Sequence, residues 1–190
     1  MAAQKPDFEL LVARCLKNDG DAQHLLYRLF APRMLGVCER YTGSDAEAED
    51  VLQDAFVRVF AKLKDFRNDG ALEGWVYRIV VTTALSHYKR EKAHRQLHVI
   101  DEMDVEIADS EATAIEQMSA EEVFELMKKL PDGCRVVLNL FAVEGYSHAE
   151  ISKLLGIQES TSKSQVCRAR KLLVRMFEKQ EQIQSNGRIC

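Results

Sequence analysis

The chain of 190 residues carries 26 basic and 30 acidic side chains, which gives a formal net charge of −4 at pH 7. This acidic balance excludes a protein that holds nucleic acid through a generally cationic surface, and the length excludes one very large core. Hydrophobic residues make up 46% of the chain, a share that excludes wholesale disorder and allows one or two small folded domains.

Apolar residues spaced three and four apart predict amphipathic helices along the first half of the chain. We expect these helices over residues 7–18, 21–41, 45–66 and 75–95. The pair Asp19 and Gly20 is expected to end the first helix, and residues 42–45 to end the second and cap the third. Because Pro32 lies inside the second helix, we expect a kink or a new first turn there. Residues 1–95 are thus predicted to form one all-α domain.

The chain changes character after this domain. Residues 96–118 hold seven acidic side chains and no Lys or Arg, with weak apolar periodicity, and we predict a flexible acidic linker. Structure is expected to resume at Ser119, which forms a capping box with Glu122. Helices are predicted over residues 121–130 and 134–144, followed by two short helices on either side of Gly156. This gives a second all-α domain over residues 119–178 and a tail over 179–190.

Apolar positions on both sides of Gly156 fit a helix-turn-helix, with Gly156 at a positive φ between two helices that cross steeply. These positions are Ala149, Ile151, Leu154, Leu155, Ile157 and Val166. The second helix is expected to begin near Ser160 and Thr161, whose hydroxyl groups can cap it. In this motif the N-terminal half of the second helix enters the major groove of DNA.

This second helix is cationic although the whole chain is acidic. Residues 161–177 include five basic side chains and no acid. Four side chains share one face that suits contact with bases: Lys163, Ser164, Cys167 and Arg168. Arg170, Lys171 and Arg175 are better placed for phosphates. A solvated basic helix end explains Lys171 and Arg175 but not Lys163, because the helix dipole disfavours a cation in the first turn.

Two surfaces of the first domain carry further candidates. The fourth helix has a polar stripe made of Arg78, Thr82, Ser86, Lys89 and Arg90. Aromatic and basic residues also bracket the loop 66–74, a combination that suits unstacked bases. Trp75 and Tyr88 fit a hydrophobic core equally well, and that alternative stays open. On the third helix Asp50, Gln53 and Asp54 form an acidic face that suits a basic protein partner or plain solvent.

Five segments resemble, in order and spacing, the extracytoplasmic-function (ECF) group of bacterial sigma factors. They are EDVLQDAFVRVF (49–60), DFRNDGALEGWVYRI (65–79), LPDGCRVVLNL (130–140), EGYSHAEISKLLGI (144–157) and STSKSQVCRARKLL (160–173). The resemblance covers nearly the whole chain. It implies an all-α specificity subunit of RNA polymerase that is not an enzyme, with sigma region 2 in the first domain and sigma region 4 in the second.

The resemblance also implies a role for each candidate residue. Region 2 binds the β′ clamp of core RNA polymerase through Asp50, Gln53 and Asp54, and it helps to melt the −10 promoter element. The residues implied in that second step are Arg67, Asn68, Trp75, Arg78, Thr82, Ser86, Lys89 and Arg90. Region 4 docks on the β flap and binds the −35 element. The residues implied there are Thr161, Lys163, Ser164, Cys167, Arg168, Arg170 and Lys171.

Core RNA polymerase and promoter DNA are thus the implied partners, with an anti-sigma factor as regulator, no cofactor, and a monomer in the free state. Some positions depart from the family pattern and bear on which promoter sequence is bound: Thr82, Ser86, Ser160, Ser162 and Gln165. Two other protein classes stay open. One is a dimeric activator that binds DNA by itself, and the other is an enzyme with an appended DNA-binding domain, for which no catalytic motif is found.

Cysteine, histidine and apolar patterns bear on metals and location. The five cysteines include no C-x-x-C pair, and His94 and His98 have no third ligand at metal spacing, so we expect no metal site. Reduced thiols fit the cytosol. No apolar run exceeds four residues, whereas a membrane span needs about 20, so we expect a cytoplasmic protein without membrane insertion. Cys167 fits either a contact to a thymine methyl group or an oxidation-sensitive switch.

Overall fold

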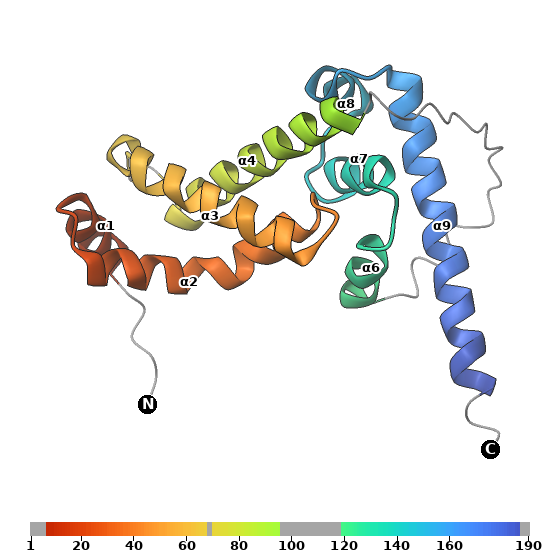
Figure 1. Cartoon of the computed structure of the whole chain (residues 1–190), viewed down its shortest axis with the longest axis horizontal. Coiled ribbons are helices and arrows are strands. Elements are labelled where there is room, and N and C mark those ends of the chain that lie inside the picture. The colour runs from red at the N-terminus through yellow and green to blue at the C-terminus, as the bar shows by residue number, and fades with distance from the viewer. Residues whose placement is uncertain (1–6, 68–69, 96–118, 187–190) are drawn as a thin grey trace. The chain divides into compact units, whose positions relative to one another are not determined.

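The computed structural model describes residues 7–67, 70–95 and 119–186, and all regular elements in these ranges are helices (Figure 1). The chain divides into two compact units, Met1–His94 and Arg95–Cys190. The helices of the N-terminal unit are α1 (Phe8–Leu16), α2 (Gly20–Glu39), α3 (Asp45–Lys62), the 3₁₀ helix η1 (Leu63–Asp65) and α4 (Leu72–Arg95). Those of the C-terminal unit are α6 (Ala120–Met127), α7 (Asp132–Ala142), α8 (His148–Leu155) and α9 (Glu159–Asn186). The predicted all-α class is confirmed, and the predicted linker over 96–118 lies outside the described residues.

The boundary between α1 and α2 differs from the prediction. The first helix ends at Leu16, and the left-handed conformation that follows is taken by Asn18 (φ 58°), not by a glycine. Asp19 is the N-cap of α2, and its carboxylate accepts hydrogen bonds from two backbone N–H groups of the first turn. Asp19 and Gly20 therefore begin a helix, because a carboxylate at the N-cap satisfies donors that have no partner within the helix. The predicted cap of the third helix is confirmed, with Ser44 as N-cap of α3.

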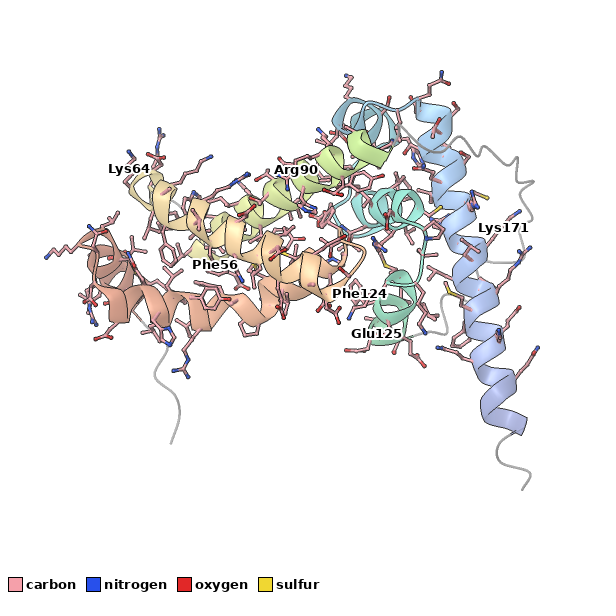
Figure 2. The ribbon with its side chains drawn as sticks, in the orientation of Figure 1. Phe56, Lys64, Arg90, Phe124, Glu125 and Lys171 are labelled. Atoms are coloured by element: carbon pink, nitrogen blue, oxygen red, sulfur yellow. The ribbon has the colours of Figure 1, made fainter. Side chains whose placement is uncertain are left out.

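A core of aliphatic and aromatic side chains holds the N-terminal unit together. Its fully buried members include Leu26, Met34, Val59, Val76 and Val80. Phe56 of α3 points toward α2, where its ring meets the ring of Tyr27 edge-on at a centroid distance of 4.7 Å (Figure 2). The second helix continues through Pro32 without a break, so no new first turn forms there. The fourth helix begins at Leu72, which is buried, and not at Trp75 as predicted.

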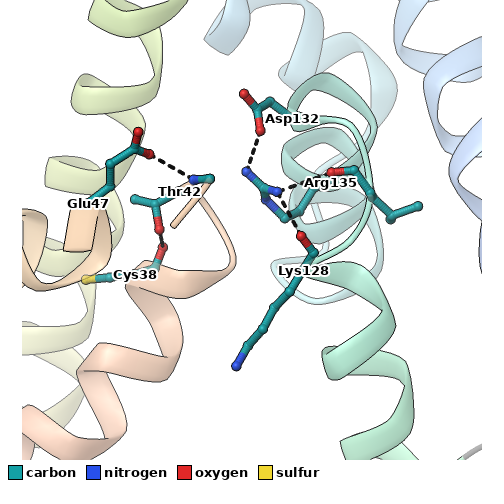
Figure 3. Close-up of polar contacts among 8 residues, drawn as sticks. Cys38, Thr42, Glu47, Lys128, Asp132 and Arg135 are labelled. Carbon is teal, nitrogen blue, oxygen red and sulfur yellow. Dashed lines mark hydrogen bonds and ion pairs between the residues drawn. The ribbon is translucent and has the colours of Figure 1, made fainter. Parts of the chain in front are cut away.

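Polar contacts hold α4 against α2 and α3. They are the ion pair of Arg33 with Glu73, the hydrogen bond from Arg40 to the Tyr77 hydroxyl, and the hydrogen bond from Arg58 to the Thr83 hydroxyl. Two further bonds close the turn between α2 and α3 (Figure 3). The Thr42 hydroxyl donates to the Cys38 carbonyl at 3.1 Å, and the Gly43 N–H donates to the Glu47 carboxylate at 2.9 Å. The side of α4 that carries Arg78, Thr82 and Ser86 is exposed to solvent.

Two capping boxes begin helices of the C-terminal unit. Ser119 and Glu122 form the predicted one at α6, and Ser147 and Glu150 form a second one at α8. The Glu150 carboxylate accepts from the Ser147 N–H at 2.8 Å and from the Ser147 hydroxyl at 2.7 Å. Such hydrogen bonds favour the charged form, and they lower the pKa of Glu122 and of Glu150. The second box was missed although its sequence, Ser-x-x-Glu before an apolar run, is the usual signal.

A buried arginine joins α6 to α7. Only 2% of the Arg135 side chain is exposed, and its guanidinium pairs with the Asp132 carboxylate at 2.7 Å (Figure 3). It also donates to the carbonyl oxygens of Lys128 and Leu130, at 3.3 and 3.2 Å, where the chain leaves α6. The cation thus lies at the C-terminal end of one helix and the carboxylate at the N-terminal end of the next, which is the arrangement that both helix dipoles favour.

The last helix is much longer than predicted. One helix of 28 residues, α9, replaces the expected short one and extends through Asn186 into the segment predicted as a tail. It begins at Glu159, and the Ser160 hydroxyl bonds to the Gln158 side chain, so the predicted hydroxyl cap does not form at Ser160. Gly156 ends α8 in the predicted left-handed conformation, with φ 65° and ψ 37°. Among the apolar positions of the predicted motif, Ala149 is exposed.

Candidate functional site

The C-terminal unit contains the predicted helix-turn-helix, made of α8 and α9. The buried side of α9 is formed by Ser162, Val166, Ala169 and Leu173. The predicted DNA contacts lie outside this stripe. Exposed among them are Lys163, Ser164 and Arg170, and half-buried are Thr161, Cys167, Arg168 and Lys171. Figure 2 shows Lys171 on the side of α9 that faces away from α7. All seven side chains therefore keep surface that a partner can reach.

The first turn of α9 carries an ion pair that the sequence analysis missed. The Lys163 ammonium lies 2.8 Å from the Glu159 carboxylate, and both side chains are largely exposed. The bond from Lys163 lowers the pKa of Glu159. A glutamate four residues before a lysine is the signal for such a pair, but Glu159 lies just outside the acid-free segment 161–177. Lys163 must therefore leave an acidic neighbour to reach a phosphate or a base.

Arg168 and Arg170 lie toward different ends of α7. The Arg170 guanidinium lies over the ring of Phe141, near the end of α7, with its carbon 5.9 Å from the centroid, in a cation–π contact. Arg168 is close enough to Cys134, near the start of α7, to counter the effect of burial, which raises the pKa of that thiol. Successive residues of an α-helix turn by about 100°, so Lys163 and Arg168 are about 140° apart around the axis. The four side chains predicted to contact bases therefore spread over more than a third of the circumference of α9.

Gln165 packs against α7. Its amide nitrogen is 2.9 Å from the point where a Cβ atom at position 133 would stand, so the contact depends on Gly133. The neutral side chain at Gln165, one of the departures from the family pattern, is therefore engaged within the unit.

A partly buried hydrogen bond connects the first turns of α8 and α9. Nδ1 of His148 lies 3.0 Å from Oγ of Ser162, and the Ser162 side chain has no exposed surface. The imidazole stacks on the Phe141 ring, with centroids 4.5 Å apart and planes at 11°. A hydroxyl group buried without a partner costs about 1–3 kcal/mol, so this bond explains how a serine fits in the core. The sequence analysis noted Ser162 only as a departure and did not find its partner.

The predicted polar stripe of α4 is fully exposed. Its members Arg78, Thr82, Ser86, Lys89 and Arg90 all face solvent. The Thr82 hydroxyl donates to the Arg78 carbonyl at 2.9 Å, and the Ser86 hydroxyl donates to the Thr82 carbonyl at 2.7 Å. Both hydroxyl protons are thus committed to the helix backbone, which leaves each oxygen free to accept a hydrogen bond from a ligand.

The aromatic residues beside this stripe divide between core and surface. Tyr88 is buried, whereas Trp75 is only half-buried and its ring lies 5.5 Å from the ring of Phe66, centroid to centroid. Arg67 is exposed in the loop that follows Phe66, and Asn68 lies outside the described residues. The core interpretation is therefore right for Tyr88, and Trp75 remains accessible to a ligand.

The acidic face of α3 is exposed at all three predicted positions, Asp50, Gln53 and Asp54. Val57, one turn further along, has 69% of its surface exposed. Spacings of three and four residues place Val57 on the same face as Gln53 and Asp54. An exposed valine among acidic and amide side chains suits a protein interface better than a nucleic acid, and the sequence analysis did not single it out.

Histidine, cysteine and apolar side chains bear on metal binding, oxidation and membrane contact. Within residues 7–67, 70–95 and 119–186, no group of three His, Cys, Asp or Glu side chains could hold a metal ion, and His98 lies outside these ranges. No helix of the described part of the chain is long and apolar enough to cross a membrane. Cys15, Cys38 and Cys134 are buried, and burial raises the pKa of Cys38 to about 12, whereas Cys167 is half-buried. Cys167 is thus the most accessible of these four thiols.

Comparison with known proteins covers both units. A model of "Sigma-70 region 2" matches residues 26–94, and a model of "Sigma-70, region 4" matches residues 120–173. The ECF RNA polymerase sigma-E factor of Escherichia coli K12 is 27% identical over 183 residues, which span 91% of this chain and 95% of that protein. The RNA polymerase sigma-H factor of Pseudomonas aeruginosa is 28% identical, with 91% of this chain and 94% of that protein covered.

Solved structures give more distant matches. One is the sigma factor RpoE in complex with the anti-sigma factor NepR from Bartonella quintana, with 20% identity, a TM-score of 0.45, and 82% of this chain and 96% of that chain covered. Another is CnrH in complex with the cytosolic domain of CnrY, with 22% identity, a TM-score of 0.45, and 90% and 96% covered.

Proposed function

The chain belongs to the sigma-70 family and, within it, to the ECF sigma factors, and we propose that its two units divide the work of promoter recognition between them. The family models together match residues 26–94 and 120–173, which is most of the chain. We assign residues 1–95 to region 2, residues 96–118 to an acidic linker, residues 119–178 to region 4 and residues 179–190 to a tail. In this assignment the protein acts by binding and carries out no catalysis of its own.

The acidic face of α3 binds core RNA polymerase at the β′ clamp. Asp50, Gln53 and Asp54 are all exposed on this helix, and Val57 adds an apolar centre. Charged groups at the edge of an interface steer association, and a desolvated apolar side chain at its centre contributes affinity. The surface therefore has the features that a docking site for a basic protein partner needs.

The exposed stripe of α4, with the loop before it, binds and helps to melt the −10 element. Arg78, Lys89 and Arg90 offer cations to phosphates, and the Thr82 and Ser86 oxygens can accept hydrogen bonds from base amino groups. The half-buried ring of Trp75, which lies beside Phe66, suits stacking with an unpaired base, and Arg67 and Asn68 follow Phe66 in the sequence.

The first turns of α9 bind the −35 element in the major groove, and region 4 docks on the β flap. One observation carries this proposal: α9 packs its apolar stripe inward and leaves its cations outward directly after the left-handed turn at Gly156. That is the arrangement by which a helix-turn-helix enters a groove. Thr161, Ser164 and Cys167, which are exposed or half-buried on the same helix, complete the contact surface.

Partners and location follow from family membership. Core RNA polymerase and promoter DNA are the partners, and both place the protein in the cytoplasm. An anti-sigma factor is the class of regulator that we propose, acting on a free monomer.

Run-off transcription with purified core polymerase on a library of randomised promoters tests this function. The proposal expects initiation only when the protein is present, from templates that share one upstream and one downstream element. A protein that binds duplex promoter DNA tightly without core, and does not support initiation from any template, would be an activator of another class.

A further inference from the structure

The contact between His148 and Ser162 joins two places that matter for reading DNA. His148 is the first residue of α8, and Ser162 is the fourth residue of α9. Their hydrogen bond of 3.0 Å therefore ties the first turn of one helix to the first turn of the other. Since Ser162 immediately precedes Lys163 and Ser164, any rotation of this turn changes the direction in which those two exposed side chains point.

The ring of Phe141 supports the same contact from α7. The imidazole of His148 lies flat against this ring, and the guanidinium of Arg170 lies over it as well. One aromatic side chain thus contacts a residue at the start of α8 and a cation about three turns along α9. Phe141, His148, Ser162 and Arg170 form a continuous set of contacts that spans α7, α8 and α9.

The buried position of Ser162 gives the contact its strength. The Ser162 side chain has no exposed surface, whereas His148 is half-buried, so the serine oxygen meets the imidazole inside the unit and not in solvent. Because the imidazole is held by stacking on one side and by a hydrogen bond at Nδ1, it has little freedom to adopt another orientation.

We propose that the hydrogen bond between His148 and Ser162 is a specificity-determining contact, which fixes the rotation of the first turn of α9 and so sets how Lys163 and Ser164 face the −35 element. This inference rests on the proposed function. The pair contacts no DNA itself and acts as a positioning device for side chains that do.

Three variants of the full-length chain separate positioning from stability. Ser162→Ala removes the hydroxyl, His148→Phe removes Nδ1 and keeps a flat ring on Phe141, and the double variant leaves neither polar group without a partner. Ser119→Ala serves as the control, because it breaks the capping box of α6 in the same unit and changes neither residue of the pair between α8 and α9. Tm is measured for all four variants, and a decrease of about 4–8 °C is expected for each single variant and for the control.

The readout is run-off transcription with core polymerase on templates whose −35 element is randomised and whose −10 element is constant. Both single variants are expected to lower discrimination between preferred and rejected −35 sequences about 5- to 10-fold, as expected for one misplaced base contact. The double variant is expected to recover Tm but to keep the altered preference, with no further loss beyond either single variant. Ser119→Ala is expected to lower Tm and keep the original preference.

Two results would overturn the inference. One is an unchanged −35 preference in Ser162→Ala and His148→Phe, and the other is an effect that follows Tm alone, so that the double variant recovers the original preference. If the unaltered chain gives no initiation at all, the proposed function fails. If the unaltered chain initiates and the variants keep its −35 preference, only the further inference fails.

Discussion

The ammonium group of Lys163 lies 2.8 Å from the Glu159 carboxylate, one turn earlier on the same helix. An acid beside a proposed DNA contact repels phosphates and competes for the lysine. We therefore predict that Glu159→Gln tightens promoter binding by the complete holoenzyme and steepens the log–log salt dependence by about 0.9, the value for one added phosphate contact. Binding is measured by fluorescence anisotropy over a series of salt concentrations.

Glu178→Gln is the matched control for that experiment, since Glu178 is an exposed acid further along α9. It removes the same charge without changing the surroundings of Lys163. Equal effects of the two variants would show that only net charge matters and would remove the ion pair from the account.

Loss of the Arg135 guanidinium is predicted to destabilise the C-terminal unit. Its side chain is 2% exposed and pairs with Asp132 at 2.7 Å, so Arg135→Ala leaves a carboxylate and two carbonyl groups without their donor. Because the Asp132 carboxylate is 35% exposed and can regain water, we expect a cost of about 1–3 kcal/mol. The free energy of unfolding in urea is the measurement. Arg33→Ala breaks an ion pair whose arginine is 76% exposed, and we expect little change there. Similar values for the two variants would contradict the structural role of Arg135.

Val57 is predicted to contribute to affinity for core polymerase and not to stability. Its side chain is 69% exposed, so Val57→Ala creates no cavity. If it lies at the centre of the interface, its truncation lowers affinity about fivefold or more. Competition with labelled protein for core gives the affinity, and Val143→Ala, at a position 43% exposed on the other unit, is the control. An affinity equal to that of the control would exclude Val57 from the interface.

The capping box at α8 predicts a pH dependence. Hydrogen bonds from Ser147 lower the folded-state pKa of Glu150 below its ordinary value of 4.5. The folded chain therefore binds this proton less tightly than the unfolded chain, so the contribution is complete above pH 4.5 and is lost as the pH falls through the lowered pKa.

Glu150→Gln keeps an acceptor at this cap and removes the titration. We expect its unfolding midpoint in urea to depend less on pH between about 3 and 7 than that of the parent chain. The pKa of Glu122, in the capping box of α6, is lowered in both proteins. The difference between the two pH curves therefore reports on Glu150. Parallel pH curves for the parent and the variant would refute the assignment.

Local signals in the sequence were sufficient for the helices and for the turn of the motif. Gly156 was predicted at a positive φ, and Ser119 with Glu122 as a capping box, because both depend on residues a few positions apart. Asp19 was misread as a stop, since the same residue types end and begin helices and only the partner N–H groups decide. The full length of α9 was missed because its last turns are polar, and a polar helix has no apolar period to count.

Contacts between side chains of different helices could not be predicted from the sequence. Ser162 was noted as unusual, but its partner His148 lies 14 residues away, and no rule of spacing connects them. Likewise the place of Arg170 over Phe141, and of Gln165 on Gly133, depends on how α9 packs against α7. All candidate residues within the described ranges are exposed or half-buried, as a binding surface requires. The contacts that fix their orientation depend on helix packing, and the sequence did not predict them.

Paired measurements on two variants test the division of work between α3 and α9 most directly. For Asp54→Lys and Arg168→Ala, affinity for core and dependence of initiation on the −35 element are determined with the same preparations. We predict that Asp54→Lys loses affinity for core and keeps its preference at −35, whereas Arg168→Ala binds core normally and loses that preference. If each variant loses both properties to the same extent, the two surfaces do not have separate partners, and the account is contradicted.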